Sequence, residues 1–230
     1  MSNPVLLIGA GGIGCGAALA LGAGGLGALT VVDDDVVDLS NLHRQTLFVE
    51  GDLGRPKAPA LARAVRRRFP TLMVTAVEGR FDAASAARLV SGCAVVVDGS
   101  DNLATKFLAN DAAVLAGKPL VHGAAIEGWG QLLTVAAGGR PCYRCLFEEL
   151  PPDEAAAPSC SEAGVLGPVP GVIGALQANE ALRLLAGMPP AFAGRIVRYD
   201  SRQMSVRTVR LRWNRACAVC GDHPTIRTPV

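Results

Sequence analysis

The fold is decided by residues 5–14, VLLIGAGGIG, together with the apolar segment 29–32 and the Asp33 that follows it. The first four residues are apolar without alternation, which is typical of a strand buried on both faces of a parallel sheet. Residues 13–23 then predict a helix that ends at a glycine pair, and residues 29–32 predict the next strand. Strand, helix and strand in this order form a βαβ unit.

The glycines of this unit stand where a nucleotide phosphate would bind. Gly9, Gly11, Gly12 and Gly14 lie between the strand and the helix, so the backbone can approach a phosphate at the free N–H groups of the helix start. Asp33 can accept hydrogen bonds from a ribose. The alternative is that the glycines serve only tight packing of helix on strand. A nicotinamide dehydrogenase would share this opening, so the nucleotide must be identified from residues elsewhere.

The rest of the chain repeats the alternation of strand and helix. Further helices are predicted at 56–69, 83–90 and 103–116, and further strands at 72–77, 94–98 and 120–123. After Gly130 the pattern changes to strands at 132–136, 195–199 and 205–211, with one long helix at 171–186. Residues 147–161, rich in Pro, Ala and acid, predict a surface crossover loop. We therefore predict an α/β fold, a Rossmann-like doubly wound, mostly parallel sheet extended by antiparallel C-terminal strands, in a single domain over 1–230.

Composition excludes several classes of protein. With 230 residues, 50% hydrophobic, 18% charged and a mean hydropathy of +0.32, the chain can bury a sizeable core and is not disordered. The net charge of +2, with no basic block beyond 66–68, argues against nucleic acid or an anionic membrane as partner. The uncharged segment 3–32 has no positive residues before it, and nine glycines interrupt it, so neither a signal peptide nor a membrane helix is predicted. A cytoplasmic protein is expected.

Charged residues gather after the second predicted strand. Asp33, Asp34, Asp35 and Asp38 would repel a phosphate unless a divalent cation is bound or they point away, whereas Asn41 and Arg44 could hold phosphate oxygens. Lys57, at a helix start, is either an ammonium group at a phosphate or a solvated lysine.

A further acidic residue follows the predicted strand 94–98. Asp101 could hold Mg²⁺ through its carboxylate. The alternative reading, which does not exclude the first, is that Asp101 or Asn102 caps the next helix. Lys106, on that helix, is expected to be nearly silent when replaced.

Seven cysteines in a reducing compartment are not expected to form disulfides. Cys15 and Cys93 lie in apolar runs and are predicted to be inert core thiols. Two C-x-x-C pairs remain, formed by Cys142, Cys145, Cys217 and Cys220. Four thiolates suit one structural Zn²⁺ that would clip the C-terminal tail to the body; redox pairs or another metal are the alternatives.

Taken together, these motifs resemble the ThiF/MoeB/HesA family of ubiquitin-activating-enzyme-like adenylyltransferases, over about residues 5–221. The resemblance rests on the glycine motif, Asp33, residues 39–45 (LSNLHRQ), Lys57, Asp101-Asn102, residues 141–146 (PCYRCL), residues 160–168 (CSEAGVLGP), residues 171–174 (GVIG) and residues 217–221 (CAVCG). It implies binding of ATP and Mg²⁺, and activation of the C-terminal Gly-Gly carboxylate of a small β-grasp sulfur carrier as an acyl-adenylate, with release of pyrophosphate. It also implies a nucleotide-binding half at about 1–124 and a carrier-binding and zinc half at about 125–221.

The resemblance carries roles to individual residues. The nucleotide and its phosphates would be contacted by Gly11, Gly12, Asp33, Ser40, Asn41, Arg44, Gln45, Lys57, Asp101 and Asn102. Among these, Arg44 would bind phosphate, Lys57 the α-phosphate region and Asp101 the magnesium. Cys160 is either the thiol that forms a thioester or acyl-disulfide with the carrier or a bystander. No general base is needed because a carboxylate nucleophile is already ionised, so His43 is expected to be structural and His122 a core or site-wall residue.

Two departures from the family pattern affect these expectations. The N-terminal segment whose arginine reaches into the partner subunit's site has no counterpart here, so the phosphate clamp or the expected homodimer could differ. No sulfurtransferase domain follows the second C-x-x-C, so a separate sulfur donor is expected. The competing functions are adenylation of a peptide or tRNA-bound carboxylate, a noncatalytic carrier-binding subunit, and an NAD-dependent dehydrogenase. The last would leave Arg44, Lys57 and both C-x-x-C pairs unused.

Overall fold

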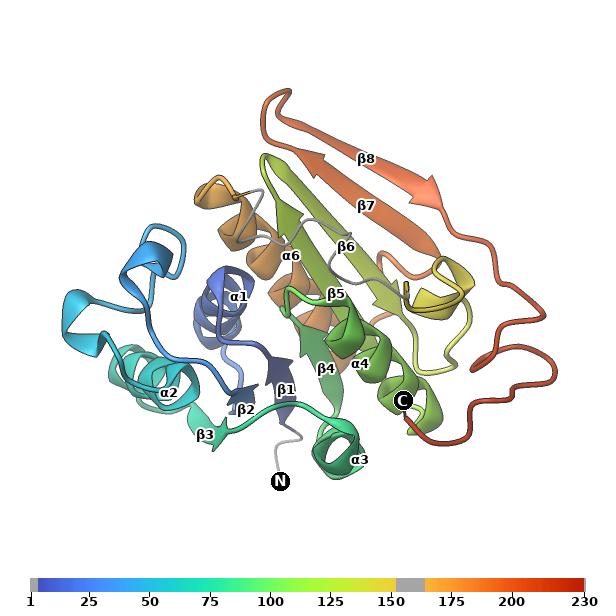
Figure 1. Ribbon diagram of the computed structural model, residues 1–230, viewed down its shortest axis with the longest axis horizontal. Helices are drawn as coiled ribbons and strands as arrows, with labels where there is room; N and C mark the ends of the chain where they lie inside the picture. Colours follow the sequence, from blue (N-terminus) through green and yellow to red (C-terminus); the bar gives the residue numbers. More distant parts are fainter. Residues whose placement is uncertain (1–3, 152–163, 230) are drawn as a thin grey trace.

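A computed structural model, which describes residues 4–151 and 164–229, shows one eight-stranded sheet with helices on both faces (Figure 1). The strand order is β3-β2-β1-β4-β5-β6-β7-β8. Strands β1 to β5 are parallel to one another, and β6, β7 and β8 continue the sheet from β5 in antiparallel pairs. The strands are β1 (Val5–Ile8), β2 (Ala28–Asp33), β3 (Met73–Glu78), β4 (Val95–Asp98), β5 (Leu120–Ile126), β6 (Trp129–Val135), β7 (Arg195–Asp200) and β8 (Ser205–Arg210).

Two layers of helix cover the parallel part of the sheet. The helices are α1 (Gly12–Ala23), α2 (Lys57–Arg68), α3 (Ala83–Ser91), α4 (Leu103–Leu115) and α6 (Pro168–Leu185), with short 3-10 turns η1 (Leu39–Asn41), η2 (Glu50–Asp52) and η3 (Tyr143–Cys145). Within β1, Val5 and Leu7 belong to the core formed with α1, α2 and α6, whereas Leu6 and Ile8 belong to the core formed with α3 and α4. This two-sided burial is the reason that the strand is apolar without alternation.

The predicted fold class is confirmed, and the largest differences are at three element ends. Helix α6 begins at Pro168 rather than at 171, because a proline in the first helical turn loses no intrahelical hydrogen bond. Strand β5 runs on to Ile126 and β6 begins at Trp129, so the pair forms a longer hairpin than residues 120–123 and 132–136. Gly130 within that hairpin leaves the space that the Ile173 side chain occupies.

Two further expectations concern membranes and the crossover loop. Within the described residues, no helix is long and apolar enough to cross a membrane. Most of the predicted crossover loop, including Cys160, lies outside the described residues.

The carboxyl ends of β1, β2, β4 and β5 meet at one edge of the sheet, which is where ligands bind in doubly wound folds.

Candidate nucleotide site and cysteine cluster

The glycine turn after β1 divides into a packed part and an open part. Gly9 has a φ of +89°, and a Cβ at Gly14 would lie 2.0 Å from the Gly9 carbonyl oxygen, so these two glycines are required by the protein's own packing. At Gly11, by contrast, a Cβ would meet only Gln45 Nε2, at 4.0 Å. The packing alternative thus accounts for Gly9 and Gly14, but it leaves Gly11 with open space at the start of α1. Among the described residues, no side chain caps that helix start.

Asp33, at the end of β2, is hydrogen-bonded to the glycine turn. Its Oδ2 accepts a hydrogen bond from the Ala10 N–H at 2.7 Å, and its Oδ1 accepts one from the Asp35 N–H at 2.8 Å. Burial raises the pKa of Asp33 above its ordinary value, although these two N–H groups act in the opposite direction. The carboxylate therefore joins the loop after β2 to the start of α1.

The segment 39–45 folds over the same turn. Arg44 Cγ lies 3.3 Å from the point that a Cβ at Gly12 would take. Gln45 is buried; its Nε2 donates to Asn41 Oδ1 at 3.1 Å, and its Oε1 has no hydrogen-bond partner in the described part of the chain. The structure thus places Gln45 at Gly11 and Arg44 at Gly12, with Asn41 hydrogen-bonded to Gln45. At Gly12 the Pro170 Cβ also lies 3.0 Å from the point that a Cβ would take, so among the described residues the open part of the turn is at Gly11.

Two of the acidic residues after β2, Asp35 and Asp38, are paired with polar groups of the protein itself. The Asp38 carboxylate accepts hydrogen bonds from the N–H and hydroxyl of Ser40, which hold the pKa of Asp38 below its usual range. Lys57, at the start of α2, is buried, and its ammonium group forms an ion pair with Asp35. Lys57 is therefore not a solvated lysine, and its charge lies in the same loop as Asp33.

A buried charged cluster lies beneath the carboxyl end of β4. Asp98 Oδ2 accepts hydrogen bonds from Lys106 Nζ at 2.9 Å and from His122 Nδ1 at 2.8 Å, and Oδ1 accepts one from the Ser100 N–H at 2.9 Å. Lys106 Nζ also donates to the Gly123 carbonyl at 2.6 Å. Burial opposes ionisation, yet Lys106 and His122 hold the pKa of Asp98 well below its usual range. Burial lowers the pKa of His122, which makes it a neutral core histidine, as expected.

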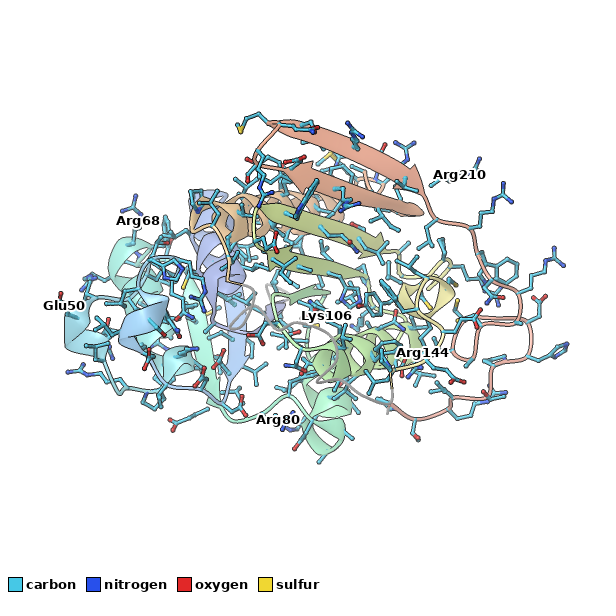
Figure 2. The ribbon with its side chains drawn as sticks, turned by 45° about the horizontal axis from the view of Figure 1, so that its top comes forward. Glu50, Arg68, Arg80, Lys106, Arg144 and Arg210 are labelled. Atoms are coloured by element: carbon cyan, nitrogen blue, oxygen red, sulfur yellow. The ribbon has the colours of Figure 1, made fainter. Side chains whose placement is uncertain are left out.

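The position of Lys106 contradicts the expectation that its replacement would be nearly silent. The helix that carries it was predicted correctly, but the lysine faces the sheet and is only 5% exposed. Figure 2 labels Lys106 in the interior, where α4 meets the sheet. The sequence could not show that Asp98, eight residues earlier, supplies a buried counter-charge.

Asp101 and Asn102 lie between β4 and α4. The Asn102 side chain caps α4 by accepting a hydrogen bond from the Thr105 N–H at 2.8 Å, so the capping interpretation is correct for this residue. Asp101 is exposed beside it. The preceding Gly99 packs against the glycine turn, because a Cβ there would lie 3.2 Å from the Gly14 nitrogen. Asp101 is thus two residues from a direct contact with the candidate nucleotide site.

The four cysteines of the C-x-x-C pairs form one cluster although 71 residues lie between the pairs. All four Sγ atoms lie within 4.8 Å of one another. The Cys142 and Cys217 Sγ atoms are 3.6 Å apart, and the Cys145 and Cys220 Sγ atoms are 3.4 Å apart. A tetrahedral zinc with bonds of about 2.3 Å needs sulfur atoms about 3.8 Å apart. The cluster fits such an ion, whereas Cys15 and Cys93 are separate buried thiols, with pKa values raised by burial to about 12 and about 11.

The cluster is attached to α4 by a polar network that the sequence did not predict. Arg144, within the first C-x-x-C, forms a bidentate ion pair with the buried Asp111 at 2.8 Å for both bonds. Asn110 Oδ1 accepts a hydrogen bond from the Tyr143 N–H at 2.8 Å. The available signal was the Asn110-Asp111 pair among the apolar residues of the second half of α4. Buried polar residues of this kind need partners, and the cysteine turn supplies them.

Comparison with known proteins gives a family and a set of relatives. The model described as the ThiF family matches residues 2–219. The chain is 46% identical over 222 residues to the SAMP-activating enzyme E1 of Haloferax volcanii, which covers 96% of this chain and 82% of that protein. It is 43% identical over 228 residues to the sulfur carrier protein adenylyltransferase of Thermus thermophilus, covering 97% and 84%.

A third relative is longer than this chain. The adenylyltransferase and sulfurtransferase MOCS3 of Dictyostelium discoideum is 43% identical over 227 residues, covering 98% of this chain and 53% of that protein. Among solved structures, E. coli MccB with ATP gives a TM-score of 0.82 at 20% identity, covering 95% of this chain and 66% of MccB. At that identity the likeness establishes the fold alone.

Proposed function

The chain belongs to the ThiF family, and on that premise we propose that it is an adenylyltransferase that activates the C-terminal Gly-Gly carboxylate of a small ubiquitin-like sulfur carrier. The observation that carries the proposal is the glycine turn, because the protein's own packing leaves Gly11 free while Gln45, hydrogen-bonded to Asn41, lies beside it and Arg44 lies at the adjacent Gly12, so that polar groups converge on this turn. Relatives at 43% identity or more are named as adenylyltransferases or as an activating enzyme of such carriers. A dehydrogenase would have no use for this convergence.

In this proposal the triphosphate of ATP lies at the start of α1. The free N–H groups of that helix and the backbone at Gly11 and Gly12 bind phosphate oxygens. Arg44, with Ser40, Asn41 and Gln45 around it, binds the outer phosphates, and Asp33 accepts hydrogen bonds from the ribose. Lys57 reaches the α-phosphate region by sharing its ammonium donors between Asp35 and a phosphate oxygen.

The reaction is an in-line displacement. A carboxylate oxygen of the carrier forms a bond to the α-phosphorus while the bond from that phosphorus to the bridging oxygen breaks, and pyrophosphate leaves with the electron pair. Both reactants are anionic, so the protein must neutralise charge and align the attack. Mg²⁺, when bound at Asp101 with phosphate oxygens, supplies charge neutralisation. Arg44 and Lys57 supply positive charge from the chain, and no proton needs to be removed.

The direct test is ATP–pyrophosphate exchange with each candidate carrier of the same genome. We expect exchange with at least one carrier, dependent on its C-terminal glycine pair. Exchange with a peptide or a tRNA-bound carboxylate alone would replace the carrier in this proposal. Absence of exchange, together with carrier binding, would indicate a noncatalytic subunit.

Asp101→Ala is expected to shift the magnesium dependence of exchange. Removing one carboxylate ligand weakens Mg²⁺ binding, so half-maximal activity should require several-fold more magnesium, with about a hundredfold loss at low magnesium. The measurement is a magnesium titration of the exchange rate. Glu50→Ala, which removes one exposed carboxylate on η2, is the control and should leave the midpoint nearly unchanged. An unaltered midpoint in Asp101→Ala would remove Asp101 from the metal site.

We also propose that Cys142, Cys145, Cys217 and Cys220 hold one structural Zn²⁺. Four thiolates leave no open position for water, so the ion closes the C-terminal segment onto α4 rather than taking part in catalysis. Cys142→Ser is expected to lose the metal and to lower the unfolding temperature by well over 10 °C, since a structural zinc contributes folding free energy outright. Elemental analysis and thermal unfolding check this, with Cys93→Ser as the thiol control. A wild-type protein purified without chelators that contains no zinc would contradict it.

Three further parts of the proposal concern the sulfur transfer, the oligomeric state and the cellular compartment. A separate sulfur donor acts on the adenylate, and Cys160 either receives the carrier or is a bystander. A homodimer is supported by the family and by a broad hollow of about 920 Å³ between α1, α2 and α6, whose lining includes Gly16, Ala20, Phe69 and Ala175. A reducing cytoplasmic setting is supported by the six described cysteines, none of which forms a disulfide.

A further inference from the structure

The β7–β8 hairpin concentrates positive charge that is dispersed in the sequence. Residues 195–212 contain Arg195, Arg198, Arg202, Arg207, Arg210 and Arg212, against Asp200 as the one acidic residue. These arginines alternate with other residue types, so they form no run. The hairpin is the last pair in the sheet, and β8 is its edge strand (Figure 1). Figure 2 shows Arg210 near the end of β8, on the outer side of the sheet.

Two of these arginines face each other directly. Arg198 on β7 and Arg207 on β8 are paired in the antiparallel register, and both are exposed. Like charges directly opposite each other destabilise a sheet. Neither arginine forms an ion pair with any acidic residue in the part of the chain that the structure describes. Asp200, two residues along on the same face of β7, forms no ion pair among the described residues, and its Oδ1 accepts hydrogen bonds from the Arg202 and Gln203 N–H groups at 2.9 and 3.1 Å.

A small hollow lies at this arginine pair. Its volume is about 150 Å³, and it is lined by Trp129, Arg198, Asp200, Gln203, Ser205 and Arg207. The Arg198 guanidinium stacks on the Trp129 ring at 4.6 Å, which fixes its position. The buried Ser205 Oγ has no hydrogen-bond partner among the described residues. With two arginines and one aspartate in its lining, the hollow keeps a net positive charge beside an aromatic wall.

From these contacts we infer that the hollow binds a carboxylate side chain from the surface of the sulfur carrier, so that Arg198 and Arg207 select the carrier. This inference rests on the proposed function. A carboxylate accepts bidentate hydrogen bonds from guanidinium groups, and it relieves the repulsion between Arg198 and Arg207. The exposed Val206 and Val209 on the same strand give the apolar contact that protein interfaces combine with arginine and aromatic residues.

An acidic protein fits this surface better than a nucleic acid does. The net charge of +2 means that the chain outside the hairpin is net negative, so no continuous basic path extends from the hairpin along the molecule. The hollow admits one small planar group rather than a backbone of repeated phosphates. Positive charge confined to one hairpin steers and orients an acidic protein.

The test compares two double variants with the same change in net charge. Arg198→Gln/Arg207→Gln is expected to raise the KM for the carrier by about 10- to 100-fold in ATP–pyrophosphate exchange, and to flatten its dependence on salt. Arg88→Gln/Arg227→Gln, at exposed positions outside the hairpin, should leave the KM within about twofold. A carrier with one surface acid changed to arginine should regain binding to Arg198→Glu/Arg207→Glu, which identifies the bound carboxylate.

Each contrary outcome has a distinct meaning. An equal KM in both double variants, with wild-type exchange intact, would overturn the inference and leave the proposed function standing. Loss of binding to single-stranded RNA, with an unchanged carrier KM, would overturn it in favour of a nucleic acid. If the wild type shows no exchange, the proposed function fails. Calorimetric Kd values for the carrier then still test whether the hairpin binds it, and an unchanged Kd in the hairpin variant overturns the inference.

Discussion

Lys106→Ala is expected to lower the free energy of unfolding by about 3–5 kcal/mol, the cost of leaving one partner of a buried ion pair uncompensated. The Lys106 ammonium group lies on the Asp98 carboxylate and on the Gly123 carbonyl, and Asp98 is fully buried. His122 remains beside Asp98, but burial lowers its pKa and favours its neutral form. Urea unfolding of the variant measures the effect. Exchange activity should fall as well, because Asp98 also fixes the Ser100 turn that leads to Asp101.

The control for this prediction is the remaining lysine outside the site. Lys118→Ala removes a half-buried lysine after α4 and should change stability by less than about 1 kcal/mol. The double variant Asp98→Asn/Lys106→Met removes both charges and should be less destabilised than the sum of the two single variants. Additive effects, or a Lys106→Ala variant as stable as Lys118→Ala, would show that the buried pair contributes little.

Lys57→Ala and Arg44→Ala should each reduce ATP–pyrophosphate exchange by about a hundredfold, or about 3 kcal/mol in the free energy of activation. Both side chains lie at the loop that covers the glycine turn, and the proposed displacement places negative charge there. Their ion-pair and packing partners are at least partly exposed, since Asp35 is 63% exposed, so folding should be retained. Initial rates at saturating carrier and ATP check the prediction.

Stability and metal content separate this loss from misfolding. Both variants should unfold near the wild-type midpoint and retain the metal of the cysteine cluster. Lys118→Ala again serves as the lysine control and should exchange at the wild-type rate. Lys106→Ala cannot serve as this control because its lysine is buried. Wild-type exchange in Lys57→Ala and Arg44→Ala would remove these residues from the phosphate site.

The parallel sheet was predictable because its central strands β1 and β4 are buried on both faces and therefore read as apolar runs, whereas the edge strand β3 is partly exposed. The site could be predicted as far as its residues follow those strands: Gly11, Asp33 and Arg44 lie together because successive strands end at one edge of the sheet. The cysteine cluster was predictable from spacing, since two C-x-x-C pairs supply one set of four thiols.

The features that escaped the sequence depend on partners that only the tertiary fold supplies. Lys106 is indistinguishable from a surface helix lysine until α4 is placed on the sheet with Asp98 beneath it. The Arg198–Arg207 pair depends on the register of β7 and β8, which a shift of one residue would abolish. Similarly, Gln177 of α6 donates to the Asp98 and Val121 carbonyl groups at 2.7 and 2.8 Å, and this contact needs the whole doubly wound arrangement.

The central claim is that the carrier's terminal carboxylate becomes bonded to the α-phosphorus of ATP. The most direct measurement is intact mass spectrometry of a candidate carrier after incubation with this protein, ATP, Mg²⁺ and pyrophosphatase. The account predicts a mass increase equal to one adenylyl group, absent when the last glycine of the carrier is deleted and strongly reduced with Lys57→Ala. A carrier of unchanged mass under conditions where it binds the protein, with every carrier of the genome tried, would contradict the account.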